Sequence, residues 1–126
     1  MAASKKKKPQ NPLLWVVDPV MEEPSYMERS WVGCEAVYLH GHLVLVLCSG
    51  AEPWNGLLIP AEHRFHDGVM NDFGDIVPHP VLRKWLYLSQ DTEDFEAVAS
   101  AVVDAVRSGD RRFGVEPRER KKRRAE

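Results

Sequence analysis

Two pairs of histidines are the residues of this chain best suited to bind a metal. His63 and His66 stand three positions apart, so both would lie on one face of a helix. His40 and His42 flank Gly41, where the chain reads as a turn. Four imidazoles brought together would form a tetrahedral nitrogen site for Zn²⁺. Because no zinc motif of the His-Glu-x-x-His type is present, solvated surface histidines are the alternative, and we expect no cofactor unless these pairs meet.

The candidate nucleophiles, Cys34 and Cys48, both border apolar segments. They could face each other across a hairpin, but no secretory signal is recognisable, so we expect a reducing compartment and two buried free thiols. Ser49-Gly50 lacks the Gly-x-Ser-x-Gly pattern of the α/β-hydrolases, and the sequence has no Gly-rich phosphate loop. These features favour a protein without catalysis. We expect a cytoplasmic location, or a nuclear one in a nucleated cell.

Basic residues gather at both ends of the chain. The nine that stand out are Lys5, Lys6, Lys7, Lys8, Arg120, Lys121, Lys122, Arg123 and Arg124. The two arms hold ten Lys/Arg and three Glu, a formal charge of +7, whereas the middle holds seven Lys/Arg and sixteen Asp/Glu, a charge of −9. Because like-charge blocks at termini are usually solvated, we predict disordered arms at 1–11 and 116–126 and one folded domain at 12–115.

The arms could bind a protein partner, or contact the phosphates of nucleic acid in a salt-sensitive and sequence-independent way. The acidic middle argues against nucleic acid lying on the folded domain itself. Four tryptophans, at positions 15, 31, 54 and 85, are expected to pack in the core or at its edge. A base-stacking sheet needs aromatic residues beside basic ones, and the sequence neighbours of these tryptophans are mostly acidic. No apolar run approaches the roughly 20 residues that cross a bilayer, so we expect a soluble protein without a membrane partner.

The segment that must organise the fold is the apolar stretch 35–48. His40-Gly41 divides it and resembles the Asn-Gly pair of a type I′ hairpin turn, because Gly, and His more than most residues, accept a positive φ. The five apolar residues from Leu43 to Leu47 suit a central strand that is covered on both faces. The sequence therefore predicts a hairpin at the centre of a sheet.

The clearest helix follows residue 91, where Asp91 or Thr92 is expected to cap it. Its apolar face has the spacing i, i+3, i+4, i+7, i+11 and consists of Phe95, Val98, Ala99, Val102 and Val106. Gly109 stands where a left-handed cap belongs. This helix must pack on the sheet, since its valines are mediocre helix formers.

The remaining segments are read from their composition. We predict a short strand or extended arm in 11–20, a loop in 21–30, strands at 57–59, 81–82 and 85–88, and a short helix opening at Pro60 and ending near Gly68. Such an order gives an α+β two-layer sandwich, with a mostly antiparallel sheet and helices on one face.

Several short motifs resemble a known group of proteins. They are Leu58-Ile59-Pro60, the run His79-Pro80-Val81-Leu82, the run Trp85 to Leu88, and Thr92 to Glu96. With the hairpin, their order resembles the small luciferase-domain proteins, and it is also similar to the MmcQ/YjbR-like domains. His79 and Trp85 are the best single matches. The first resemblance implies a small α+β domain of mostly unknown role that lacks luciferase catalysis. The second implies a two-layer α+β domain of a group sometimes described as DNA-binding.

These observations favour a small non-catalytic binding or regulatory domain with basic tails and a protein partner. Two alternatives remain open. One is a small metal-dependent enzyme that uses the histidine pairs, and the other is a protein that binds nucleic acid weakly through its tails.

Overall fold

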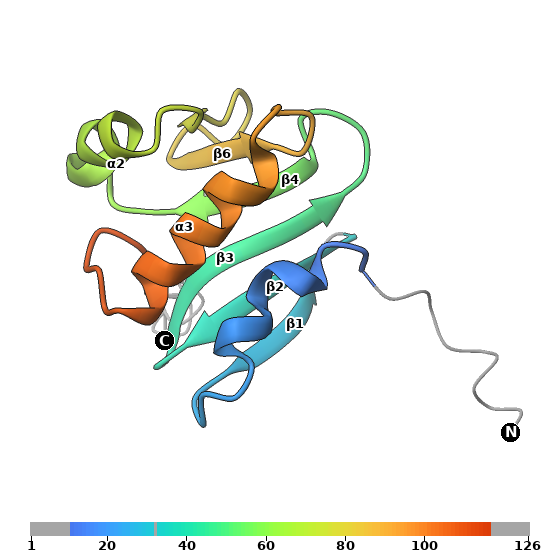
Figure 1. Cartoon of the computed structure of the whole chain (residues 1–126), viewed down its shortest axis with the longest axis vertical. Coiled ribbons are helices and arrows are strands. Elements are labelled where there is room, and N and C mark those ends of the chain that lie inside the picture. The colour runs from blue at the N-terminus through green and yellow to red at the C-terminus, as the bar shows by residue number, and fades with distance from the viewer. Residues whose placement is uncertain (1–10, 32, 117–126) are drawn as a thin grey trace, which may run out of the picture.

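A single six-stranded antiparallel sheet forms the centre of the fold. The computed structural model describes residues 11–31 and 33–116, and its sheet has the strand order β1-β2-β3-β4-β6-β5 (Figure 1). The strands are β1 (Met27–Trp31), β2 (Cys34–Leu39), β3 (His42–Ser49), β4 (Asn55–Pro60), β5 (Val77–Pro78) and β6 (Trp85–Ser89). Helices accompany the sheet, so the predicted α+β fold class is confirmed.

The predicted central hairpin is present as β2 and β3. Its turn residues His40 and Gly41 both have positive φ, at 52° and 80°. Tyr38 pairs with Leu43, whereas Val37 pairs with Leu45, so Val44 is an extra residue in β3. Such a bulge lets two consecutive side chains point to the same face, and both Val44 and Leu45 belong to the core beneath the helices.

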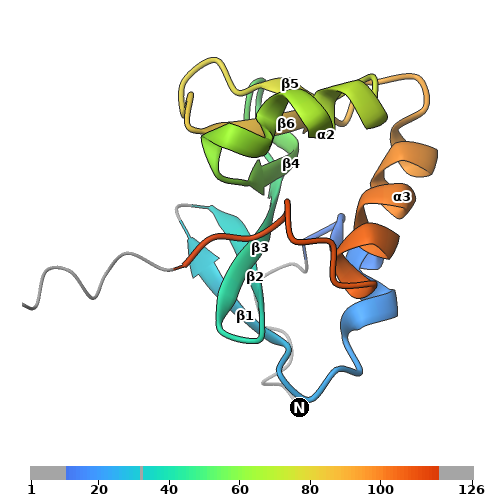
Figure 2. The same cartoon turned by 90° about the vertical axis from the view of Figure 1, so that its left-hand side faces the viewer.

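The helical layer consists mainly of η1 (Leu14–Val20), a 3-10 helix, and α3 (Phe95–Arg107). Figure 2 shows both on the same side of the sheet. The expected strand or extended arm in 11–20 is therefore wrong. Leu13, Val16, Val17 and Val20 are buried at the helical spacing i, i+3, i+4, i+7, so packing favours a helix although it contains Pro19.

The predicted helix after residue 91 is confirmed, and its C-terminal cap is well defined. Phe95, Ala99 and Val102 are buried against the sheet. Gly109 has φ of 89°, its N–H donates to Val106 O, and the next N–H, of Asp110, donates to Ala105 O. These two bonds make a Schellman cap. The helix begins at Phe95, and the expected capping by Asp91 or Thr92 is not found, because Asp94 precedes it without a side-chain cap.

Other predicted boundaries need correction. Pro60 ends β4, and the helix expected to open there is instead η2 (His63–Phe65) followed by α2 (His66–Asp72), which continues through Gly68. The predicted loop at 21–30 contains all of β1 except Trp31, and the predicted strand at 81–82 lies in a turn. Every β1 residue but Trp31 is exposed, so no buried-exposed alternation marks this strand in the sequence.

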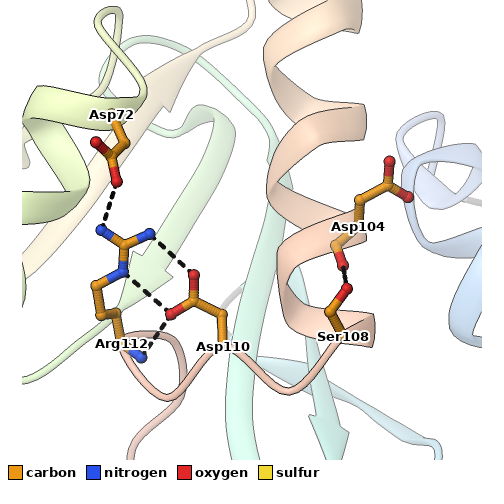
Figure 3. Close-up of polar contacts among 5 residues, drawn as sticks. All are labelled: Asp72, Asp104, Ser108, Asp110 and Arg112. Carbon is orange, nitrogen blue, oxygen red and sulfur yellow. Dashed lines mark hydrogen bonds and ion pairs between the residues drawn. The ribbon is translucent and has the colours of Figure 1, made fainter.

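The segment after α3 returns to the sheet, and hydrogen bonds of Arg112 stabilise its position. Its guanidinium donates to both oxygens of Asp110, at 3.1 and 2.9 Å, and to Asp72 at the end of α2, at 2.8 Å (Figure 3). Two backbone bonds then join Val115 to Leu43. Within the described residues, no helix is long and apolar enough to cross a membrane.

Candidate functional site

The face of the sheet that points away from α3 is also apolar. We call it the open face, since α3 and η1 lie on the opposite side of the sheet (Figure 2). Its buried side chains form a cluster of their own, made by Cys34, Ala36, Val46, Cys48, Leu58 and Tyr87. The helices in the described part of the chain contribute their buried apolar side chains to the other cluster. Something else must therefore keep the open face from water.

Side chains of the sheet and its loops, most of them aromatic, provide that cover. Six partly buried residues pack on the cluster: Trp31, Tyr38, Leu43, Trp54, Leu82 and Trp85. The indole centroids of Trp31 and Trp85 lie 5.8 Å apart. Trp31 is on β1 and Trp85 is on β6. Four inter-strand spacings separate these two strands, so in a flat sheet they would lie about 19 Å apart. The sheet must therefore curl so that the two indoles meet above the open face.

Cations lie on this aromatic cover. The guanidinium carbon of Arg29 is 6.0 Å from the centroid of the Tyr38 ring, and the Lys84 ammonium is 5.8 Å from that of Trp85. Both cations come from exposed residues. In the described part of the chain neither makes an ion pair, since the three ion pairs there involve Arg64 and Arg112. The open face thus combines partly exposed aromatic rings with two cations that form no ion pair within the described residues.

Exposed apolar side chains extend the open face at its rim. Met27 is 47% exposed and pairs across the strands with Tyr38, and Val77 is 46% exposed and pairs with Tyr87. Cross-strand partners share a face, so both side chains point to the open side. Val81, beside His79, is 60% exposed. Met27 and Val77, two of the four exposed large apolar residues in the described chain, therefore belong to the open face or its rim.

His79, one of the two positions that best match the resemblance, is fully buried at one end of this face. Its Nε2 lies 2.9 Å from Pro53 O, and its Nδ1 accepts the N–H groups of Val81 and Leu82, at 3.0 and 2.9 Å. These partners require a neutral ring protonated at Nε2. Burial accordingly lowers the pKa of His79. Its ring also packs against Trp54, so the imidazole holds the segment at Pro53 and Trp54 in place.

A short polar network continues from His79 into the central strands. The His79 ring lies edge-on to Tyr87, whose hydroxyl donates to the Asn55 side chain. Burial raises the pKa of Tyr87, so the hydroxyl stays protonated and keeps donating. The Nδ2 of Asn55 also donates a hydrogen bond to Oδ2 of Asp91, at 3.4 Å. Gly56 follows with φ of 147°, and a Cβ there would lie 2.2 Å from Leu88 O, so only glycine lets β4 and β6 pair so closely.

Cys34 and Cys48 form a disulfide on the open face, so the prediction of free thiols is wrong. The two residues stand opposite each other on β2 and β3, with Cα atoms 4.5 Å apart, next to the Glu35–Leu47 pair. This spacing is typical of the closer class of antiparallel pairs and lies within disulfide range. Both residues lie at the ends of the hairpin in the sequence, but the expected reducing compartment does not predict their pairing.

The structure brings together only parts of the predicted zinc site. The rings of His63 and His66 lie 4.9 Å apart, and the buried His66 places Nε2 at 3.1 Å from Ala61 O. His40 and His42 are exposed at the hairpin turn, where the backbone N–H of His40 donates to Ser25 Oγ. Among the described residues no group of three or more His, Cys, Asp or Glu side chains is placed to hold a metal ion. The four-histidine site remains a prediction.

A groove of about 530 Å³ lies beside the hairpin turn. Its walls come from the turn and from the segment after α3, and they include His40, His42, Glu62, Asp110 and Arg111. Arg112 stabilises this segment but also occupies the Asp110 carboxylate. The groove therefore carries mixed charge and is less distinctive than the open face.

The nine basic residues of the two arms lie outside the described residues. No protein-family model, curated protein or solved structure with which the chain was compared matches it. The resemblance to the luciferase-domain and MmcQ/YjbR-like groups therefore stays an expectation, and the function must be argued from the site.

Proposed function

We propose that this chain is a small non-catalytic binding domain and that the open face is its binding surface. The contact between Trp31 and Trp85 carries the proposal, because it leaves two large aromatic rings partly exposed above a closed apolar cluster. Trp, Tyr and Arg are enriched where proteins bind their partners. All three occur together here, with Arg29 above Tyr38.

The layer beneath the rings is rigid, which a binding surface requires. The disulfide joins β2 to β3, and His79 and Asn55 anchor the loops behind β4 and β6. A surface that is already ordered loses less conformational entropy when its ligand binds. Tyr87 supports the aromatic cover in this way and is not itself expected to touch the ligand.

The metal-dependent alternative uses the two histidine pairs, and its support is that the rings of His63 and His66 lie 4.9 Å apart. Zinc binding would need further ligands, since among the described residues no group of three or more candidate ligands is placed to hold a metal ion. Metal analysis of the purified protein tests this alternative. Stoichiometric zinc that is lost in a His63→Ala/His66→Ala variant would favour the enzyme, and an absence of bound zinc would remove its support.

Affinity capture from host extract tests the proposed surface. Immobilised full-length protein is compared with Trp85→Ala and with Trp15→Ala, the matched control. Trp15 is 42% exposed and packs edge-on against Phe95 in the helical layer. We expect the captured molecules to be lost with Trp85→Ala and retained with Trp15→Ala, provided both variants keep the circular dichroism of the parent. Equal capture by Trp85→Ala would contradict the proposal.

A further inference from the structure

We propose that the ligand of the open face is single-stranded nucleic acid, whose bases stack on the aromatic cover while its phosphates contact Arg29 and Lys84. This inference rests on the proposed binding function and names its ligand class. Exposed rings provide the first support. Trp31, Tyr38 and Trp85 come from three strands and are all partly exposed. Aromatic rings bind bases of any sequence, because every base presents a π face.

The charge of the open face provides the second support. Arg29 and Lys84 sit on the same rings that would stack with bases, and in the described part of the chain no carboxylate pairs with either. Arg83, next to Lys84, is also exposed. A cation beside a stacking ring can reach the phosphate of the stacked nucleotide. Arg29 is nine positions from Tyr38 in the sequence, so sequence neighbours alone do not show that contact, whereas Lys84 directly precedes Trp85.

The acidic residues of the sheet lie on its other side. Glu28 pairs with Val37 of the helix-side core, and Glu35 alternates with the open-face residues Cys34 and Ala36. Burial and the nearby Glu35 raise the pKa of Glu28, as expected for two carboxylates on one face. At physiological ionic strength charges are screened beyond about 8 Å. The negative total charge of the middle of the chain therefore does not describe the open face.

Two carboxylates do approach the open face at one end. Glu52 and Asp91 lie near Tyr87 and contribute to raising its pKa. The path of a bound strand should therefore avoid that end and run from Arg29, over Trp31 and Trp85, to Lys84. A double helix is not expected to bind in this way, because its bases are already stacked and paired. The basic arms at both ends of the chain can add phosphate contacts.

Fluorescence anisotropy of the full-length protein with labelled oligonucleotides tests the inference. The probes are oligo-dT and oligo-rU of about 16 nucleotides, near the upper end of single-strand site sizes, and a duplex of equal length. We expect both single strands to bind more tightly than the duplex. If only oligo-rU binds, the ligand is RNA, and if only oligo-dT binds, it is DNA. Trp85→Ala should weaken binding about tenfold or more, and Trp15→Ala should not change it.

A second variant does not depend on the packing of an aromatic ring. Arg29→Ala/Lys84→Ala removes two exposed cations, and it should lower the slope of log K against log salt by about 0.7 for each phosphate that the protein no longer neutralises. A variant in which all four lysines from Lys5 to Lys8 are replaced by Gln measures the contribution of the N-terminal arm to the affinity separately. Unchanged affinity of both open-face variants, with binding abolished only in the arm variant, would overturn the inference.

The absence of binding to every probe at about 50 mM salt would also overturn the inference. The proposed function would survive that result if capture from host extract still depended on Trp85, and the ligand would then be a protein. If capture from host extract were also unchanged in Trp85→Ala, both proposals would fail.

Discussion

The indole of Trp31 on β1 meets that of Trp85 on β6, with ring centroids 5.8 Å apart and planes tilted by 47°. This contact joins strands that are separated by β2, β3 and β4 in the sheet. It closes the curl of the sheet over Ala36, Val46 and Leu58, which are almost fully buried although the helices lie on the other side. The pair therefore contributes to the stability of the fold and to the candidate binding surface.

The first prediction concerns this contact. In a double-mutant cycle of Trp31→Ala and Trp85→Ala, we expect a coupling free energy of about 0.5–1.5 kcal/mol, typical of aromatic pairs. Urea denaturation of the parent, both single variants and the double variant measures it. Additive effects would mean that the two indoles do not touch in solution.

The second prediction concerns His79 and pH. Burial lowers its pKa in the folded protein below the unfolded value of about 6.5, so the unfolded chain binds more protons as the pH falls. The stability that the neutral ring provides is fully present above about pH 6.5 and decreases as the pH falls towards the folded pKa. Urea midpoints at several pH values between 8 and 5 should therefore decrease more in the parent than in His79→Gln. Parallel pH profiles would contradict the buried neutral ring.

The third prediction concerns Arg112. Its hydrogen bonds hold the pKa of Asp110 below the usual range, so the stability from this pair is present above the unfolded pKa of about 3.9 and is lost as the pH falls through the folded value. Arg112→Ala should cost about 1–3 kcal/mol at neutral pH, because it leaves Asp110 and Asp72 without their partner.

Arg64→Ala is the matched control for Arg112→Ala. Arg64 pairs with Glu62, but their side chains are 72% and 55% exposed, so its removal should cost less than about 1 kcal/mol. Thermal unfolding of both variants at pH 7 makes the comparison. Equal destabilisation by the two variants would mean that the segment after α3 is not held by Arg112.

The fourth prediction concerns the disulfide. Cys34 and Cys48 are 14 positions apart, and closing a loop of about 15 residues stabilises a fold by about 3 kcal/mol in the chain-entropy description. We expect reduction to lower the free energy of unfolding by roughly this amount. We also expect no thiol to react when the unfolded, unreduced protein is alkylated, and mass spectrometry would show otherwise if the cysteines were free.

The features predicted correctly from the sequence are those with a strong local signal. His40-Gly41 marks the hairpin because the turn needs positive φ, and Gly109 marks the end of α3 for the same reason. The helix η1 was not predicted although Val16, Val17 and Val20 have helical spacing, because the apolar run between Pro12 and Pro19 is short, and the helix instead continues through Pro19.

The open face had no comparable signal in the sequence. Its rings come from β1, β2 and β6, and Arg29 reaches Tyr38 only because the two strands pair. Neighbours along the chain suggested acidic surroundings for the tryptophans, whereas side chains alternate between the two faces of a sheet. In β1 the pairing with β2 places Arg29 and Trp31 on the open face and Glu28 and Ser30 on the other face, and only the structure shows this separation.

Photocross-linking of the full-length protein to oligo-rU and oligo-dT, followed by mass spectrometry of the peptides, tests the central claim most directly. We predict cross-links in the peptides that carry Trp31, Tyr38 and Trp85, and their disappearance when unlabelled single strand competes. Cross-links confined to the basic arms, or to the helical layer around Trp15, would contradict the open face as the binding surface.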